Sequence, residues 1–123
     1  MTASMSVAPP NCLLLIAEAP TSTVPRGTRA ASGIAATRSC IGVGCLMFLD
    51  GETTVTLGYP RRNDGRPAFD GYLDTPHRKV AVWTVEWVKL LETNVPTTRT
   101  RIRVWTNHPI EPADIYVGVG EGA

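Results

Sequence analysis

The feature that most constrains this chain is a series of short segments between residues 53 and 119 in which apolar and polar residues alternate with a period of two. The clearest is RTRIRVW at 99–105, where Thr100, Ile102 and Val104 fall on one side of a strand. Similar segments, rich in β-branched and aromatic residues, are TTVTLG at 53–58, KVAVWTVEW at 79–87 and DIYVGV at 114–119. Turn-forming residues separate them, so the pattern predicts an all-β fold, a small antiparallel β-sandwich or a partly open barrel.

Two further segments extend this pattern. We expect residues 40–49 to form the first strand of the domain, ending at the turn signal Asp50-Gly51. This apolar run is too short to cross a bilayer, so no membrane partner is expected. Residues 88–95, VKLLETNV, leave three alternatives open: a continuation of the strand before them, a short helical turn or a hairpin partner.

The N-terminal part has a different composition from the rest. The first 49 residues hold one acidic and three basic residues, whereas the remainder holds ten acidic and nine basic residues. Residues 1–39 show no sustained period, and their one apolar run, at 12–17, is too short for a signal peptide. An organelle transit peptide is less favoured, because Pro20 and Pro25 would interrupt its amphipathic helix.

We therefore predict a division of the chain at about residue 40. Residues 1–39 are interpreted as a poorly ordered leader, or as translation from an upstream start or a shifted frame, and residues 40–123 as a single β domain. A chain that begins near Ser39 should then fold as well as the whole protein.

Charge and cysteine content limit the function classes. A net charge of +1 over 123 residues provides no strong field for nucleic acid, so any charged partner must meet a local patch. The three cysteines, Cys12, Cys40 and Cys45, lack the spacing of a zinc knuckle, and an odd number without a framework favours reduced, buried thiols. We expect a cytoplasmic protein with no metal and no cofactor.

An arginine row is the strongest interaction candidate. The period of two puts four side chains on one face of a strand: Arg99, Arg101, Arg103 and Trp105. Guanidinium groups match carboxylates or phosphates, and the indole adds a stacking surface. The favoured partner is an acidic protein surface, and nucleic acid is the less favoured one. The favoured interpretation is nevertheless a solvated face whose arginines pair with Glu86 and Glu92.

Two histidines suggest a second class of function. Each lies beside a proline and near carboxylates: His77 near Asp70 and Asp74, His108 near Glu111 and Asp114. A small hydrolase that uses both loops is conceivable, although no nucleophile or metal signature accompanies them. Solvated loop histidines are the favoured explanation.

The order of these segments resembles a known group of proteins. Phe69-Asp70-Gly71 after a turn-rich loop, a pair of strands, and a late strand with Arg101, Val104 and Trp105 are similar to small uncharacterised bacterial all-β proteins. These are distantly similar to the competence-associated inhibitor of the DNA-entry nuclease. The resemblance covers residues 41–119 and implies a non-enzymatic binding protein that blocks an enzyme, with no catalytic residues to transfer.

Overall fold

The computed structural model describes residues 2–8, 13–20, 34–44, 51–59, 66–107 and 113–120, and these residues form strands and turns with no helix. The strands are β1 (Thr2–Val7), β2 (Leu13–Ala17), β3 (Ile34–Ala36), β4 (Ile41–Gly44), β5 (Thr53–Gly58), β6 (Phe69–Asp74), β7 (Lys79–Thr84), β8 (Lys89–Asn94), β9 (Arg99–Thr106) and β10 (Asp114–Val119). Each predicted alternating segment contains one of these strands, so the all-β prediction is confirmed.

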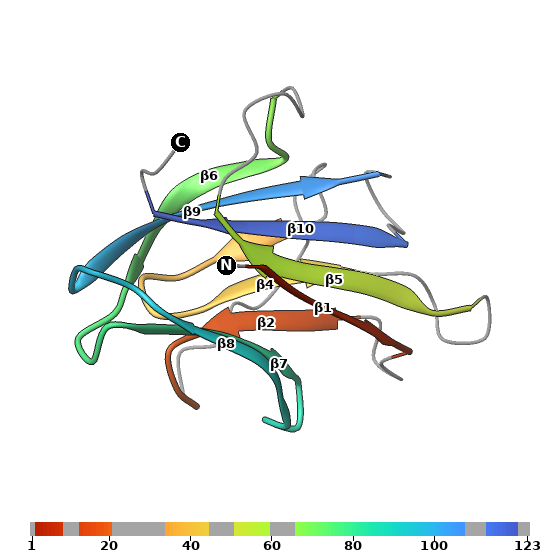
Figure 1. Cartoon of the computed structure of the whole chain (residues 1–123), viewed down its shortest axis with the longest axis horizontal. Coiled ribbons are helices and arrows are strands. Elements are labelled where there is room, and N and C mark those ends of the chain that lie inside the picture. The colour runs from red at the N-terminus through yellow and green to blue at the C-terminus, as the bar shows by residue number, and fades with distance from the viewer. Residues whose placement is uncertain are drawn as a thin grey trace.

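The strands form two sheets of five. The first has the order β1-β5-β10-β9-β6 and the second β3-β4-β2-β7-β8 (Figure 1). All neighbouring strands run antiparallel except β5 and β10, which are parallel. The sheets pack against each other and do not close into a barrel, so the fold is an antiparallel-rich β-sandwich.

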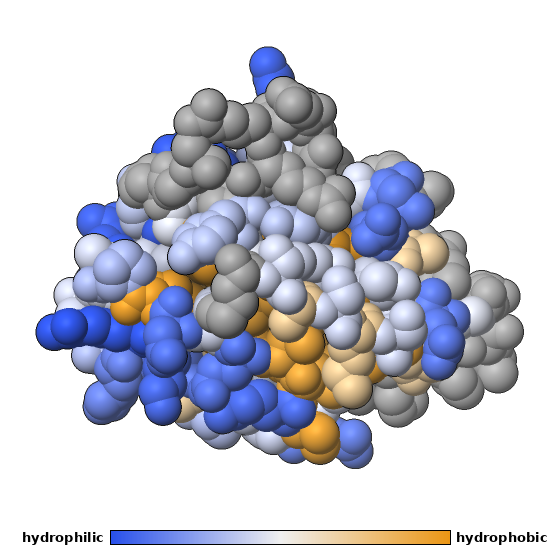
Figure 2. All heavy atoms as spheres, in the orientation of Figure 1, coloured by the Kyte–Doolittle hydropathy of each residue, from blue (hydrophilic) through white to orange (hydrophobic). Residues whose placement is uncertain are grey.

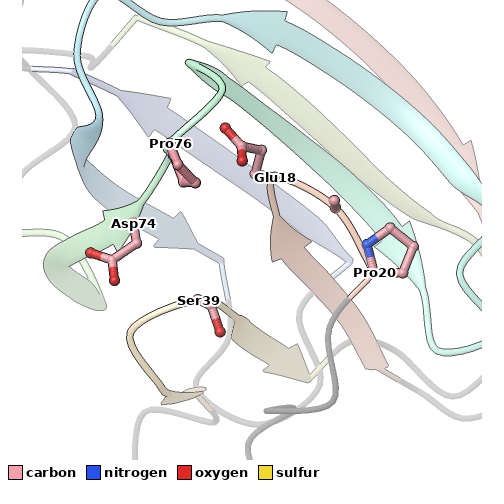
Figure 3. A pocket seen from close by; sticks show the side chains of 6 residues that line it. Glu18, Pro20, Ser39, Asp74 and Pro76 are labelled. Carbon is pink, nitrogen blue, oxygen red and sulfur yellow. The ribbon is translucent and has the colours of Figure 1, made fainter.

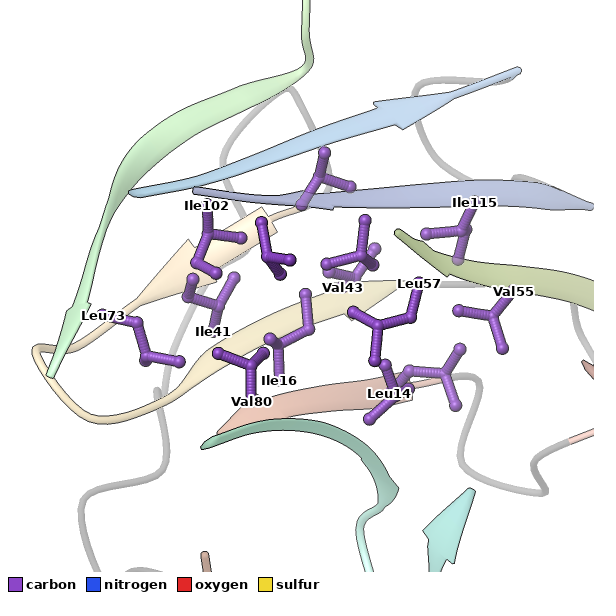
Figure 4. Close-up of a cluster of buried hydrophobic side chains, with 14 of the residues drawn as sticks. Leu14, Ile16, Ile41, Val43, Val55, Leu57, Leu73, Val80, Ile102 and Ile115 are labelled. Atoms are coloured by element: carbon purple, nitrogen blue, oxygen red, sulfur yellow. The ribbon is translucent and has the colours of Figure 1, made fainter. Parts of the chain in front are cut away.

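The core lies between the sheets and contains side chains from both. Figure 4 shows Ile102 and Leu73 from the first sheet close to Ile41, Ile16 and Val80 from the second. All five are at most 1% exposed. Branched aliphatic side chains fill such an interlayer space well, because they pack closely on a pleated surface.

Three N-terminal strands, from the part of the chain before the predicted division at residue 40, belong to the two sheets. β2 is the central strand of the second sheet, paired with β4 on one side and β7 on the other. Its Leu14 and Ile16 are each 1% exposed and belong to the main core. β1 pairs along its whole length with β5, and β3 pairs with β4. Residues 2–7, 13–17 and 34–36 are therefore strands of the two sheets.

A second apolar cluster explains why β2 showed no alternation. On the outer side of the second sheet, Leu15 and Ala17 of β2 are buried together with Cys40, Ala81 and Trp83. The Trp83 indole Nε1–H donates to the Ala17 carbonyl oxygen at 2.9 Å. A strand buried on both faces is apolar throughout, so it has no period of two for a sequence pattern to detect.

A tight turn separates β7 from β8. The strand expected over 79–87 ends at Thr84, because the Trp87 N–H donates to the Thr84 carbonyl oxygen at 3.0 Å. Trp87 has φ 63°, a left-handed conformation that is unusual for a bulky residue, and its ring packs edge-on against Trp83 at 5.5 Å. β8 then returns antiparallel to β7, so residues 88–95 are the hairpin partner.

Apolar side chains reach the surface at one side of the sandwich. Figure 2 shows apolar atoms that reach the surface between the two sheets, with hydrophilic side chains around them. Met5 of β1 is 40% exposed, and Val88, just before β8, is 55% exposed. The edge strands β1 and β8 lie at this side, and scattered exposure of apolar side chains is common on protein surfaces.

Candidate binding face on strand β9

β9 presents the arginine row on the outer face of the first sheet. Thr100, Ile102 and Val104 point into the sandwich and are at most 1% exposed, which confirms the predicted alternation. The intervening side chains therefore face outward, between β6 on one side and β10 on the other. The structure brings the three arginines to one face but gives each of them a different environment.

Arg101 is engaged by an aspartate of the neighbouring strand. Its Nε and Nη2 donate to Asp70 Oδ1 and Oδ2 at 2.8 and 2.6 Å. This two-point geometry is the strongest form of an arginine–carboxylate pair. The hydrogen bonds from Arg101, helped by the charges of Arg101 and Arg103, lower the pKa of Asp70 despite its partial burial.

The lowered pKa of Asp70 predicts a pH-dependent stability. The ionised carboxylate stabilises the fold above its unfolded pKa of about 3.9, and this contribution is lost as the pH falls through the lower folded pKa. Asp70→Asn should therefore reduce the free energy of unfolding at pH 7 and differ less from the wild type below about pH 4.

Urea unfolding between pH 7 and pH 3 measures this difference, and Arg101→Gln should reproduce it because it removes the donor. A difference between Asp70→Asn and the wild type that stayed constant over this range would contradict the assignment.

Arg103 is half-buried and partly satisfied. Its Nη2 donates to the Gly120 carbonyl oxygen at 3.1 Å. Its Nε is buried and has no acceptor among the described residues. A buried donor without an acceptor reduces the free energy of unfolding. Among the described residues, the hydrogen bond to Gly120 is the side-chain contact that offsets this cost.

Arg99 is the exposed member of the row. Its guanidinium carbon lies 4.6 Å from the centre of the Tyr72 ring, and within the described ranges it forms no ion pair. It lines a pocket of about 260 Å³ together with Arg38, Tyr72 and Asp74. The sequence pattern did not indicate that Arg38, Tyr72 and Asp74 lie beside Arg99. The alternation of FDGYLD does place Tyr72 and Asp74 on one face, whereas no pattern indicates Arg38.

Trp105 shares the outer face but is 9% exposed. Its ring packs edge-on against Tyr116 at 6.0 Å, and the Tyr116 hydroxyl donates to the Tyr59 carbonyl oxygen at 2.6 Å. The indole is thus part of the packed structure and not the exposed stacking surface expected beside the arginines.

The prediction that Glu86 and Glu92 pair with the arginine row is wrong. Glu92 lies on β8 in the second sheet and pairs with Lys89 at 2.9 Å, and Glu86 lies in the turn between β7 and β8. The partner that the structure shows is Asp70, because β6 and not β8 is the neighbour of β9.

His77 also has a partner that the sequence did not indicate. Its Nδ1 lies 3.0 Å from Glu18 Oε1, and its backbone N–H donates to Glu18 Oε2 at 2.6 Å. The imidazole is 82% exposed, whereas the Glu18 side chain is 9% exposed. His108 and Glu111 lie outside the described residues, so the structure does not describe the two-histidine site.

Of the three cysteines, the structure describes Cys40. Cys40 is a buried free thiol, and burial raises its pKa to about 11; Cys12 and Cys45 lie outside the described residues. Among the described residues, no cluster of His, Cys, Asp and Glu could hold a metal ion. The part of the chain that is described also contains no helix able to span a membrane.

The fold and this face define an all-β sandwich with a partly paired arginine row. No family model matches the chain, and no curated protein matches it in sequence. Among solved structures, it is similar to ComJ, inhibitor of the DNA degrading activity of NucA, from Bacillus subtilis, with a TM-score of 0.67 and 9% identity.

That similarity covers 96% of this chain and 94% of ComJ. It confirms the distant resemblance predicted from the strand pattern, and at this identity it shows the fold alone. The resemblance was expected over residues 41–119, but a match that leaves out 4% of the chain includes most of residues 1–39. The N-terminal strands therefore belong to the shared architecture.

Proposed function

We propose that this protein is a non-enzymatic inhibitor module that binds an enzyme through the outer face of β9 and β6. The observation that carries the proposal is the likeness in fold, over nearly the whole length of both chains, to an inhibitor of a DNA-degrading nuclease. A nuclease is accordingly the first class of target to test. Fold alone does not determine function, so the argument also needs a surface suited to binding.

The outer face of β9 and β6 supplies such a surface. Arg99 is exposed and forms no ion pair among the described residues. The Tyr72 ring beside it belongs to a residue that is 46% exposed. Arginine and tyrosine are among the residue types that most often dominate the energy of protein interfaces. The positive charge favours an acidic patch on the partner, because complementary charge raises the rate and the specificity of association.

The test is an inhibition assay. Purified protein added to an extract of its own source cells should reduce the degradation of added plasmid DNA in a dose-dependent way. Arg99→Glu should raise the concentration needed for half inhibition about tenfold or more, since a charge reversal places like charges in contact. Lys89→Glu is the matched control, because it reverses an exposed cation on the other sheet and should inhibit like the wild type.

Two results would contradict the proposal. An extract whose nuclease activity is unchanged at micromolar protein would remove the inhibitor function. Direct binding of the protein to the plasmid, with an affinity that falls steeply as salt is added, would show that it protects DNA by coating it and not by binding an enzyme.

A further inference from the structure

Two arginines from different sheets meet at one aspartate. Arg99 begins β9 and lies opposite Asp74 of β6 in the strand register. Arg38 comes from the connection between β3 and β4, and its carbonyl oxygen accepts the Asp74 N–H at 2.8 Å. This backbone hydrogen bond ties the edge of the first sheet to the β3–β4 connection of the second sheet.

The charges at this point do not balance. The Arg38 Nε lies 3.6 Å from Asp74 Oδ2, longer than the usual 2.7–2.9 Å of a charged hydrogen bond, and the Arg38 side chain is 92% exposed. Arg99 has no ion pair among the described residues. Two guanidinium groups thus lie near one carboxylate, and among the described residues only Arg38 contacts it. This leaves a local charge of about +1 and N–H donors that the carboxylate does not use.

The space between these groups has the size and the walls of a small binding site. Arg38, Tyr72, Asp74 and Arg99 line the pocket of about 260 Å³. The Arg99 guanidinium lies 4.6 Å from the centre of the Tyr72 ring. This contact restricts the guanidinium before a ligand binds, so less conformational entropy is lost on binding.

A second hollow of about 320 Å³ adjoins it and shares Asp74. Figure 3 shows the side chains of Glu18, Pro20, Ser39, Asp74 and Pro76 around this hollow. It contains carboxylates and no arginine or lysine among the described residues, so it disfavours an anion, whereas the arginine pocket favours one.

We propose that the pocket between Arg38 and Arg99 binds one carboxylate of the protein partner, an aspartate or glutamate side chain. This inference rests on the proposed function, because it assumes a protein partner. A carboxylate carries the single negative charge that balances the local excess, whereas a phosphate dianion would leave a net charge of about −1 in the pocket. Asp74 cancels one of the two arginine charges, so the pocket matches a monoanion such as a carboxylate.

The test uses a probe that does not require the partner. The blocked peptide acetyl-Gly-Glu-Gly-amide is titrated into the ¹⁵N-labelled protein, and the arginine Nε–Hε resonances are followed by NMR. We expect the Arg38 and Arg99 signals to shift, to shift less at high salt, and to remain unmoved by acetyl-Gly-Gln-Gly-amide. Arg38→Gln and Arg99→Gln should each weaken binding of the glutamate peptide about tenfold, and Lys89→Gln should not.

Three outcomes would overturn the carboxylate site. These are no shift with the glutamate peptide, equal shifts with the glutamine peptide, or inorganic phosphate that binds more tightly than the glutamate peptide. The backbone amide spectrum of each variant shows separately that it is folded. Because the titration contains no enzyme, its failure leaves the DNA-degradation assay to decide the proposed function independently.

Discussion

A chain that begins at Ser39 is expected to show no cooperative unfolding transition. This truncation removes β2, the strand that joins β4 to β7 at the centre of the second sheet. It also removes Leu14 and Ile16 from the main core and exposes the apolar side chains that packed against them. Loss of a central strand leaves two unpaired edges as well, which favours aggregation.

Circular dichroism with urea titration measures this loss, and a second truncation serves as the control. Removal of residues 1–8 deletes only the edge strand β1, most of whose residues are exposed, so that chain should keep a cooperative transition at a lower midpoint. If the chain from Ser39 unfolded cooperatively with the midpoint of the whole protein, the division of the chain at residue 40 would stand after all.

Ile16→Ala in the whole chain is expected to reduce the free energy of unfolding by about 2–5 kcal/mol. Ile16 is 1% exposed between the two sheets, so the shorter side chain leaves a cavity that the packed core fills only in part. The measurement is the urea midpoint at constant slope. A decrease of this size in the free energy of unfolding would show that β2 stabilises the intact protein. The substitution avoids the disruption that a truncation causes.

Leu13→Ala is the matched control for this substitution. Leu13 is in the same strand but is only partly buried, beside the cluster on the outer side of the second sheet. It should cost less than Ile16→Ala, because less apolar surface is removed from contact. Equal, small effects at both positions would mean that β2 contributes little to the core.

These experiments bear on the proposed function as well. The second sheet supplies the connection that carries Arg38, and its backbone bond to Asp74 positions one wall of the pocket. A variant that loses the second sheet should therefore lose inhibition together with stability, whereas Arg99→Glu should lose inhibition alone. The comparison separates a binding defect from a folding defect.

The sequence by itself determined the strands β5, β7, β9 and β10 and the direction of side chains on β9. Alternation is a local property: successive side chains of a strand point to opposite faces, so the arginines of RTRIRVW lie on one face and Thr100, Ile102 and Val104 in the core. The hairpin partner β8 was one of the alternatives left open for residues 88–95, whereas the turn that ends β7 falls inside the strand expected over 79–87.

Only the tertiary structure decided which strands are neighbours. The strand order in turn decides which residues meet in the candidate site. β6 lies beside β9, so Asp70 and not Glu92 pairs with Arg101, and Arg38 meets Asp74 across the gap between two sheets. β2 could not be recognised as a strand from its pattern, because burial on both faces removes the alternation. Such pairings depend on contacts between residues far apart in the chain, which no local period encodes.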